Sequence, residues 1–387
     1  MTEITLTSRQ RTIGLAAVIV GSAGAGLTLG TLFPLASLTL ERWDVPATLI
    51  GLNSAMQALA MLVVGPFLPR LVRRLGPVRA LLGGAGAGAA AILLLPLVPS
   101  LPVWFLLRFL IGGALALPWL VAETWINAVA REGSRARVIG LYSMALFSGM
   151  ALGPLVLQGI GSAGLLPFVI CAGALLMAAA PLVAARGLIP DLDIPKGMGL
   201  LHAVRRAPTV AGAAVLAGLS ESACYMLLPV YGVRAGLGED AALTWLTVLI
   251  VGAVALQFPL GWLADRVDRR GLLGQGALVG ALLPLLILAA LGNPWLVWLL
   301  LFLLGGTALG YYTIGLAHLG ARFAPGELAV ANAAFMVLYE SGSTGGPVLA
   351  GAAMELWPPH GYLIALSLFA AGFALLVLLR RAPAEAG

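Results

Sequence analysis

Charged residues are scarce in this sequence, and so are the residue types that build most catalytic and metal sites. Asp, Glu, Lys and Arg make up 10% of the 387 residues, where soluble domains carry about 25%. The two cysteines lie in apolar runs and the three histidines in distant segments, so neither a disulfide framework nor a metal site is indicated. The sequence has no glycine-rich phosphate loop, and we expect no catalytic residue and no cofactor.

Long apolar runs dominate the chain instead. Hydrophobic residues make up 60% of it, and its mean hydropathy is +1.02. Each run is long enough to cross a hydrocarbon core about 30 Å thick at about 1.5 Å per helical residue. The runs lie at about 12–38, 47–68, 80–98, 102–130, 138–158, 165–185, 209–233, 241–262, 272–291, 295–320, 329–356 and 362–379. The sequence therefore predicts an all-α integral membrane protein with twelve transmembrane helices in a lipid bilayer.

The positions of the basic residues predict the orientation of these helices. If the N-terminus is cytoplasmic, the inner segments hold 19 basic residues and the outer loops hold only Arg42 and Arg234. Cytoplasmic loops carry such an excess of arginine and lysine. We expect both termini in the cytoplasm, and the isoelectric point of 9.8 then needs no nucleic-acid partner. Arginine outnumbers lysine 21 to 1, which favours a GC-rich bacterial genome and hence the bacterial inner membrane.

The two halves of the chain repeat each other. Three segments align without gaps: 65–74 on 261–270 at an offset of 196, and 108–113 on 301–306 and 149–154 on 342–347 at an offset of 193. Parallel repeats of this kind form two pseudo-symmetric bundles around an axis along the membrane normal, with the substrate site between them. We expect a six-helix bundle at 1–186, a cytoplasmic linker at 187–208 and a second six-helix bundle at 209–387.

Several motifs resemble those of a known family. They are the loop motif Gly261-x-Leu-Ala-Asp265-Arg266-x-x-Arg269-Arg270, its echo at Gly65, and the helix pattern Arg108-x3-Gly112. Together with twelve helices, these motifs resemble the major facilitator superfamily over essentially the whole chain. ETWIN at 123–127 and LLPVYGVRAGL at 227–237 look most like the bacterial YcaD-type group. The resemblance implies the major facilitator fold and a rocking-bundle mechanism of alternating access.

The resemblance also implies that the loop motif gates the carrier. Its acid would hold the cytoplasmic side closed through basic groups and a helix end. The second half keeps this acid as Asp265, whereas Pro69 occupies its place in the first half. The gating candidates in the two loops are Asp265, Arg266, Arg269, Gly65 and Arg70. We expect gating to depend more on the second loop; a solvated loop that only sets topology is the alternative interpretation of the arginines.

A further motif resembles the drug:proton antiporter branch of the family. Its pattern is matched at Gly140, Gly149, Gly153 and Pro154, but residues 157–158 are Leu-Gln where the pattern ends in two glycines. Glycines four residues apart let helices approach closely, and proline removes a backbone hydrogen bond so that the helix can bend. We assign Gly149, Gly153 and Pro154 to gating, with ordinary small-residue packing as the alternative.

Proton coupling requires a titratable group inside the membrane, and such groups are rare and costly there. Three acids lie deep enough: Glu221, Glu340 and Glu123. The resemblance implies that the helices carrying Glu221 and Glu123 line the cavity, which favours these two. Arg108 lies deep in an apolar span, and it could meet one of these acids or an anionic substrate; a conformational role is the alternative. A buried carboxyl can also act only as a structural hydrogen-bonding group.

Other polar and aromatic side chains at membrane depth are candidates for substrate binding. Asn53 and Gln57 share one helix face, and Tyr311 and His318 lie seven residues apart on another helix. Aromatic walls for a planar or cationic substrate could come from Trp119, Tyr225, Tyr311 and Tyr312. Such side chains also commonly form hydrogen bonds between helices. A structural role of this kind is the alternative interpretation of each candidate.

These observations predict a secondary transporter and not an enzyme. We expect a monomer that couples to protons and exports small, partly apolar or cationic compounds. The leading alternative is a proton symporter that imports a small metabolite, and the missing glycine pair keeps that alternative open. A membrane sensor that has lost transport and a soft-metal carrier using Cys224 and Met226 have less support.

Overall fold

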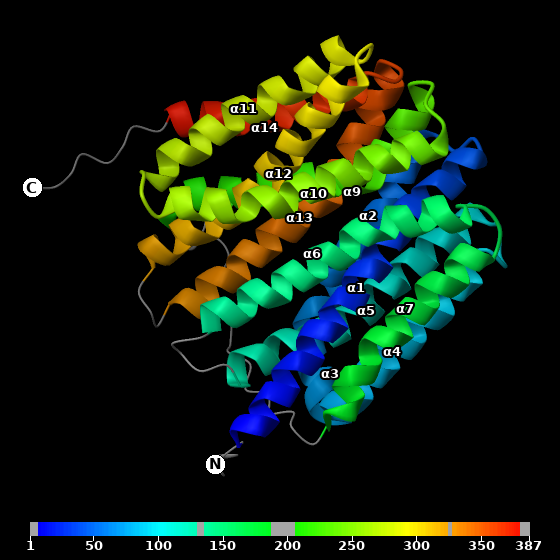
Figure 1. The fold of residues 1–387 in the computed structure, drawn as a ribbon, viewed down its shortest axis with the longest axis vertical. Helices are drawn as coiled ribbons and strands as arrows, with labels where there is room; N and C mark the ends of the chain where they lie inside the picture. Colours follow the sequence, from blue (N-terminus) through cyan, green and yellow to red (C-terminus); the bar gives the residue numbers. More distant parts are fainter. Residues whose placement is uncertain (1–6, 130–134, 187–205, 324–326, 380–387) are drawn as a thin grey trace, which may run out of the picture. The chain divides into compact units, whose positions relative to one another are not determined.

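The computed structural model describes residues 7–129, 135–186, 206–323 and 327–379, and nearly all of these are helical (Figure 1). Within this described part, eleven helices are long and apolar enough to cross a membrane. A further helix, α13 (Leu328–Leu356), is 29 residues long. The predicted all-α, multi-span fold class is confirmed, and the predicted spans coincide closely with observed helices.

The described residues of the first half form long helices and one short helical corner. They are α1 (Ser8–Arg42), α2 (Ala47–Val64), η1 (Gly65–Phe67), α3 (Leu68–Leu75), α4 (Pro77–Leu94), α5 (Leu101–Val129), α6 (Arg135–Ile160) and α7 (Leu166–Ala184). The sequence predicts that the span 47–68 continues through η1 and that a loop follows where α3 lies. Pro66 and Pro69 stand within the first two positions of these elements, where a proline has no intrahelical hydrogen bond to lose and its fixed φ favours a helix.

The described residues of the second half form α9 (Pro208–Arg234), α10 (Glu239–Ala264), α11 (Arg269–Ala290), α12 (Pro294–Arg322), α13 and α14 (Gly361–Leu379). Two of these helices begin at side-chain caps. The Asp268 carboxylate accepts hydrogen bonds from the backbone N–H groups of Arg270 and Gly271, at 3.3 and 2.7 Å. Asn293 accepts from the N–H of Leu296. Such caps satisfy donors that a helix start otherwise leaves unpaired.

The chain divides into two compact units. The first comprises residues 1–39 and 56–194, and the second comprises 40–55 and 195–387. The end of α1 and the start of α2 therefore belong with the second unit, although the sequence pattern assigns them to the first bundle at 1–186. The division at 194/195 falls inside the expected linker at 187–208, of which residues 187–205 lie outside the described part of the structure.

In the first unit, α1 and α6 touch backbone to backbone. A Cβ atom on Gly149 of α6 would collide with the carbonyl oxygen of Ala23, and one on Gly153 would collide with the backbone of Gly30. Glycines at four-residue spacing permit this approach. The α4 helix lies beside both α5 and α7 in the same unit (Figure 1).

In the second unit, α9 and α13 repeat the packing of α1 and α6. A Cβ atom on Gly342 of α13 would collide with the carbonyl oxygen of Val215 of α9, and one on Gly346 with that of Leu219. Gly342 and Gly346 are the partners of Gly149 and Gly153 at the offset of 193 residues. The sequence repeat is therefore also a repeat of helix packing.

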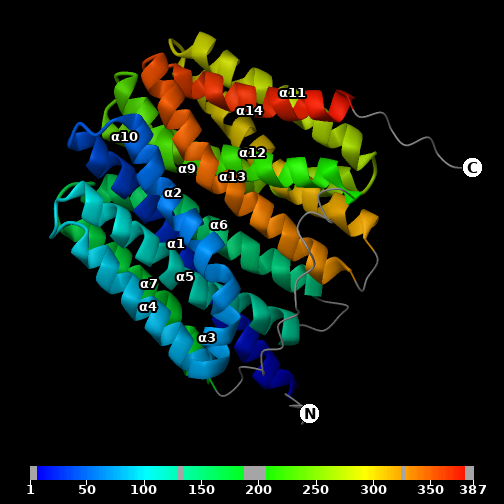
Figure 2. The same cartoon turned by 180° about the vertical axis from the view of Figure 1, so that it is seen from behind.

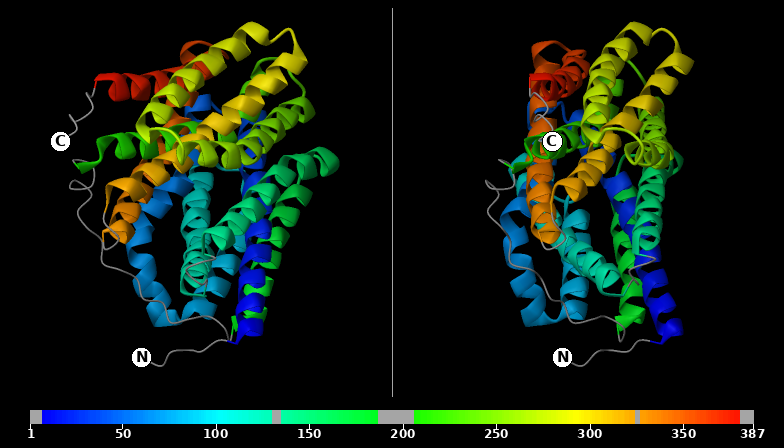
Figure 3. Two further views of the ribbon diagram at one scale, coloured as in Figure 1. Left: turned by 60° about the vertical axis from the view of Figure 1, so that its left-hand side comes forward. Right: turned by 90° about the vertical axis from the view of Figure 1, so that its left-hand side faces the viewer.

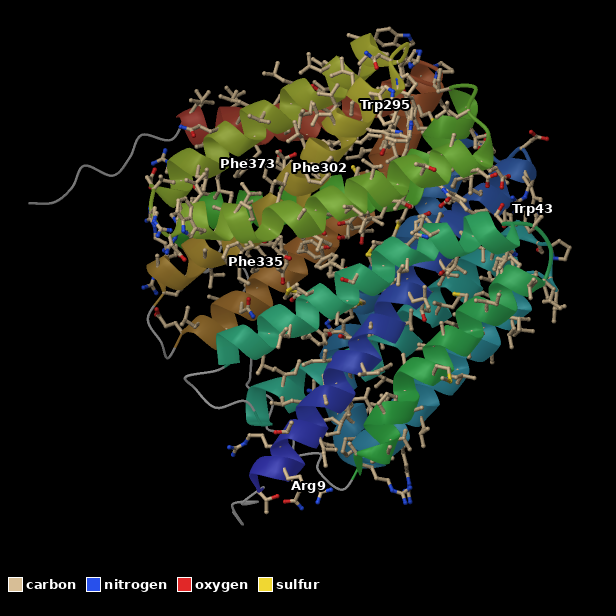
Figure 4. All side chains as sticks on the ribbon, in the orientation of Figure 1. Arg9, Trp43, Trp295, Phe302, Phe335 and Phe373 are labelled. Atoms are coloured by element: carbon tan, nitrogen blue, oxygen red, sulfur yellow. The ribbon has the colours of Figure 1, made fainter. Side chains whose placement is uncertain are left out.

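The remaining helices of the second unit pack in pairs. The α10 helix lies along α12, and α11 lies along α14 (Figures 2 and 3). Phe373 of α14 and Phe335 of α13, both labelled in Figure 4, are buried in two apolar clusters of this unit. Both clusters include residues of α9, so α9 is covered by neighbours on several sides and is the most buried of the eleven candidate membrane spans in the described part of the chain.

Candidate functional site

Glu221 is a buried carboxylic acid at the middle of α9, in the second unit. Its side chain is only 3% exposed. The Tyr339 hydroxyl of α13 donates a hydrogen bond to Glu221 Oε2 over 3.2 Å. The other oxygen, Oε1, is buried and has no hydrogen-bond partner among the described residues. One half of the carboxyl group is thus fixed, and the other half keeps an unused bonding position.

Aromatic rings extend from this carboxyl group toward α12. The Tyr312 ring meets the Tyr339 ring edge to face at 5.3 Å between centroids, and it meets Phe335 in the same manner at 5.4 Å. The Tyr312 hydroxyl lies 3.5 Å from Met336 Sδ. Edge-to-face pairs of this kind hold their rings in defined orientations. Glu221, Tyr339 and Tyr312 therefore form one polar and aromatic group, here called the Glu221 cluster.

The other two candidate acids are placed differently. Glu340 is half-buried on α13 and lies close enough to Glu221 for their charges to interact. It follows Tyr339 by one residue, so its side chain leaves the helix about 100° further round. Glu123 belongs to α5, but its side chain lies outside the described part of the structure. Of the three acids, Glu221 has the most closely described surroundings.

The remaining aromatic and histidine candidates lie in several environments. Tyr225, one turn after Glu221 on α9, is buried, and Trp119 on α5 is half-buried. Tyr311 points toward α11, where its hydroxyl donates to the carbonyl oxygen of Gly276 over 3.2 Å. His318, near the end of α12, is buried at 8% exposure and lies within electrostatic reach of the charged residues that open α11. Tyr312 thus joins the Glu221 cluster, whereas Tyr311 packs on α11.

Arg108 is the most deeply buried of the charged residues that the structure describes in the first unit. The side chain is 0% exposed, and none of its three guanidinium nitrogens has a hydrogen-bond partner among the described residues. The thiol of Cys171 on α7 lies within electrostatic reach, and that thiol itself contacts the Thr28 carbonyl oxygen of α1 at 3.5 Å. A charge buried in this way is costly unless something pairs with it. Arg108 could therefore receive an anion or an acidic group.

The amide candidates of α2 also carry unsatisfied atoms. Asn53 is 1% exposed, and both its side-chain nitrogen and oxygen are buried without a partner among the described residues. The same holds for Gln57 Oε1, one turn further along the helix. Close packing brings Gly112 of α5 against the backbone of Gln57. Unpaired buried amides are uncommon in folded proteins, and each unpaired group costs about 1–3 kcal/mol.

The two loop motifs differ in how their arginines are held. In the second unit, Arg269 donates to the Ala264 carbonyl oxygen at 3.0 Å and approaches Asp265 Oδ1 at 3.4 Å. Arg266 lies over the Trp262 ring, 3.8 Å from its centroid. Asp265 is itself 72% exposed, so this ion pair is a surface contact and contributes little.

The gating candidates of the first loop motif, Arg70 and Gly65, show no comparable contacts among the described residues. Arg70 is exposed, and the described residues offer it no hydrogen bond or ion pair. A Cβ atom on Gly65 would meet nothing within 4 Å, so this position has no steric need for glycine. By contrast, Gly149 and Gly153 lie at the contact of α6 with α1, and Pro154 follows them inside the same helix.

Segment 40–55, which we call the clasp, is fastened to the second unit by polar contacts. Arg234 at the end of α9 binds both carboxylate oxygens of Glu41, with the shortest distance 2.7 Å, and also donates to the Val45 carbonyl oxygen. Arg42 pairs with Glu239 of α10 at 2.8 Å. The backbone N–H and the hydroxyl of Thr48 both donate to Glu355 of α13.

Sequence reasoning missed Tyr339 and the clasp. Tyr339 could have been found from the glycine pair, because residues 339, 342 and 346 follow each other at helical spacing on one face of α13. The clasp could not have been found in this way. Its acids and arginines are single residues at helix ends. Glu41 and Arg234 lie at the repeat offset of 193 residues, but equivalent positions in two repeats need not touch, so the offset does not predict their contact.

Comparison with known proteins identifies the family. The model of the Major Facilitator Superfamily matches residues 18–249 and 210–387. An MFS-type transporter of Bacillus subtilis, YfkF, is 26% identical over 362 residues, covering 91% of this chain and 92% of the relative. The MFS-type transporter YcaD of Salmonella enteritidis is 25% identical over 361 residues, covering 92% of both chains.

Solved structures share the fold of this chain. A bacterial homologue of the human lysosomal transporter Spinster, in an inward-facing and unoccupied conformation, has a TM-score of 0.77 at 17% identity and covers 98% of this chain and 100% of its own. The nucleoside transporter NupG has a TM-score of 0.73 at 14% identity and covers 95% and 97%. The chain belongs to the Major Facilitator Superfamily, and it is a multi-pass membrane transporter, as the sequence predicts.

Proposed function

We propose that this protein is a proton-coupled antiporter of a bacterial inner membrane, with both termini in the cytoplasm, that exports small, partly apolar or cationic compounds. The observation that carries the proposal is the buried Glu221 carboxyl group, which is held at Oε2 by Tyr339 and has no partner at Oε1 in the part of the chain that the structure describes. A transporter that uses a proton gradient needs a group of this kind inside its span.

The Glu221 cluster is suited to exchange one positive charge for another. With a proton on Glu221, the carboxyl group is neutral and the site carries no net charge. Loss of the proton leaves a carboxylate beside the rings of Tyr339 and Tyr312, and both carboxylates and aromatic faces attract organic cations. A cationic substrate and a proton would then compete for the same group, which is the basis of antiport.

The remaining candidates receive supporting roles in this proposal. Asn53, Gln57, Tyr225, Trp119 and His318 would contribute substrate contacts, Arg108 would favour an ionised acid or an anionic group of the substrate, and Glu340 and Glu123 would be secondary proton sites. The two loop motifs and the glycines of α6 would gate one side of the carrier. On the side where α9 ends at Arg234, the clasp would break and re-form during the transport cycle.

The test uses purified protein in liposomes that contain a pH-sensitive dye. An imposed proton gradient is followed while cationic drugs and small metabolites are added one at a time. The proposal predicts proton movement that appears only with a transported compound and runs opposite to it. Proton and compound moving in the same direction would instead establish the symporter alternative, and compound flux with no proton movement would contradict proton coupling.

A further inference from the structure

The two repeated loop motifs carry the same arginines but not the same acids. Residues 65–74 contain Arg70, Arg73 and Arg74 and no acidic residue, whereas 261–270 contain Arg266, Arg269 and Arg270 together with two aspartates. At the repeat offset, Pro69 replaces Asp265 and Val72 replaces Asp268. The first motif thus has the greater uncompensated positive charge.

The arginines of the second motif make contacts within the protein. Arg266 lies on the Trp262 ring, Arg269 donates to the Ala264 carbonyl oxygen, and Arg270 donates to the Val377 carbonyl oxygen at 3.0 Å. In the first motif, Arg70, Arg73 and Arg74 are exposed, and within residues 7–129, 135–186, 206–323 and 327–379 no hydrogen bond or ion pair engages them. Arg79, at the start of α4, is exposed in the same way.

The short helix α3, which carries these arginines, has one apolar row that is buried and a second that is exposed. Leu68 and Val72 of α3 are buried against Ala80 of α4 and Ala116 of α5, which fastens α3 to the first unit. A second apolar row, spaced four residues apart, remains exposed: Phe67 at 60%, Leu71 at 39% and Leu75 at 42%. Exposed apolar residues beside arginines that have no partner among the described residues, on a short helix at the end of the candidate span Ala47–Leu75, fit the boundary between lipid tails and headgroups.

We propose that α3, with Arg70, Arg73 and Arg74, is a binding site for anionic phospholipid headgroups at the surface of the membrane. The three guanidinium groups would donate to lipid phosphates, which is the geometry that arginine favours. Phe67, Leu71 and Leu75 would pack against the part of the acyl chains nearest the headgroups. A soluble phosphate ion would account for the arginines only, whereas a lipid accounts for both rows of side chains.

The binding test uses the full-length protein in nanodiscs and a fluorescent probe on Leu75→Cys. Both natural cysteines, Cys171 and Cys224, are fully buried, so an added surface thiol can be labelled selectively. Brominated phosphatidylglycerol and brominated phosphatidylcholine are compared as quenchers at equal mole fraction. The proposal predicts at least about twofold stronger quenching by phosphatidylglycerol, because each arginine near an anionic surface adds roughly fivefold to lipid attraction. Equal quenching by the two lipids would overturn it.

The repeat supplies a matched control. The triple variant R70Q/R73Q/R74Q should lose the preference for phosphatidylglycerol, whereas R266Q/R269Q/R270Q removes the same charge from the other motif and should keep it. Loss of the preference in both variants would mean that general positive charge, and not α3, recruits the lipid. Thermal unfolding of the wild type in detergent gives a second readout: phosphatidylglycerol should raise the melting temperature, and an equal rise with inorganic phosphate would overturn the lipid assignment. Neither readout depends on transport.

Discussion

Tyr339 of α13 donates its hydroxyl hydrogen to Glu221 of α9 across 3.2 Å. The two helices also touch through Gly342 and Gly346, which lie on the same face of α13 as Tyr339. The hydrogen bond is therefore set by the packing of two backbones and does not depend on a flexible loop. Any change in the distance between α9 and α13 must alter the surroundings of Glu221.

Replacing Tyr339 with Phe should impair transport without unfolding the protein. The substitution removes the hydroxyl group and leaves Glu221 with no described hydrogen-bond donor, a loss of about 1–3 kcal/mol for a buried polar group. We expect a several-fold lower transport rate and an altered pH profile of transport. Tyr311→Phe is the matched control, because its hydroxyl donates to the Gly276 carbonyl oxygen; it should lower the melting temperature and leave the pH profile unchanged. If the pH profile of Tyr339→Phe matched that of Tyr311→Phe, Tyr339 would have no part in proton coupling.

Adjacent glycines of α13 should respond in opposite ways to alanine. A Cβ atom on Gly346 would collide with the Leu219 carbonyl oxygen, whereas one on Gly345 meets only Leu219 Cδ2 at 3.5 Å, an ordinary contact. Gly346→Ala should cost about 1–3 kcal/mol of stability through overpacking. Gly345→Ala should be neutral or stabilising by up to about 1 kcal/mol, because alanine favours a helix over glycine. Thermal unfolding in detergent measures both, and similar melting temperatures would contradict the packing described here.

Arg108 should show a conflict between stability and function. Its guanidinium group is fully buried without a hydrogen-bond partner among the described residues, and placing such a group in a membrane costs roughly 3 kcal/mol. Arg108→Leu should therefore melt at the same or a higher temperature than the wild type and yet lose transport. Arg108→Lys keeps the charge and should retain part of the activity. A strongly destabilised Arg108→Leu protein would show that the arginine has a structural partner.

The clasp should contain one strong ion pair and one weak one. Arg234 holds Glu41 through two parallel hydrogen bonds, and their side chains are 25% and 16% exposed. Arg42 and Glu239 are more exposed, at 31% and 34%. Double-mutant cycles with glutamine should give a coupling energy of about 1 kcal/mol for the first pair and less than about 0.5 kcal/mol for the second. The reverse order would mean that the two-bond geometry does not govern the clasp.

The sequence predicts the fold well because hydropathy and glycine spacing are local signals. The apolar runs place the helices to within a few residues, and the pair Gly149 and Gly153 correctly indicates a close helix contact. The contacts of the candidate site are harder to predict from the sequence. Depth in the apolar runs selects Glu221 together with Glu340 and Glu123. The donor to Glu221, Tyr339, lies 118 residues away, and that contact depends on how two helices are rotated against each other. The helix α3 escapes prediction because its arginines and Pro69 are typical of a loop.

The most direct test of the central claim separates proton coupling from substrate binding at Glu221. Proteoliposomes containing Glu221→Gln are loaded with a compound that the wild type transports, and two activities are measured: exchange of that compound across the membrane without a gradient, and its accumulation driven by a proton gradient. Glutamine keeps the size of the side chain but cannot release a proton. We expect gradient-driven accumulation to disappear and exchange to persist at a reduced rate, because the rings of Tyr339 and Tyr312 remain while the carboxylate is lost; Glu340→Gln should keep both activities. Gradient-driven accumulation at the wild-type level in Glu221→Gln would contradict the account.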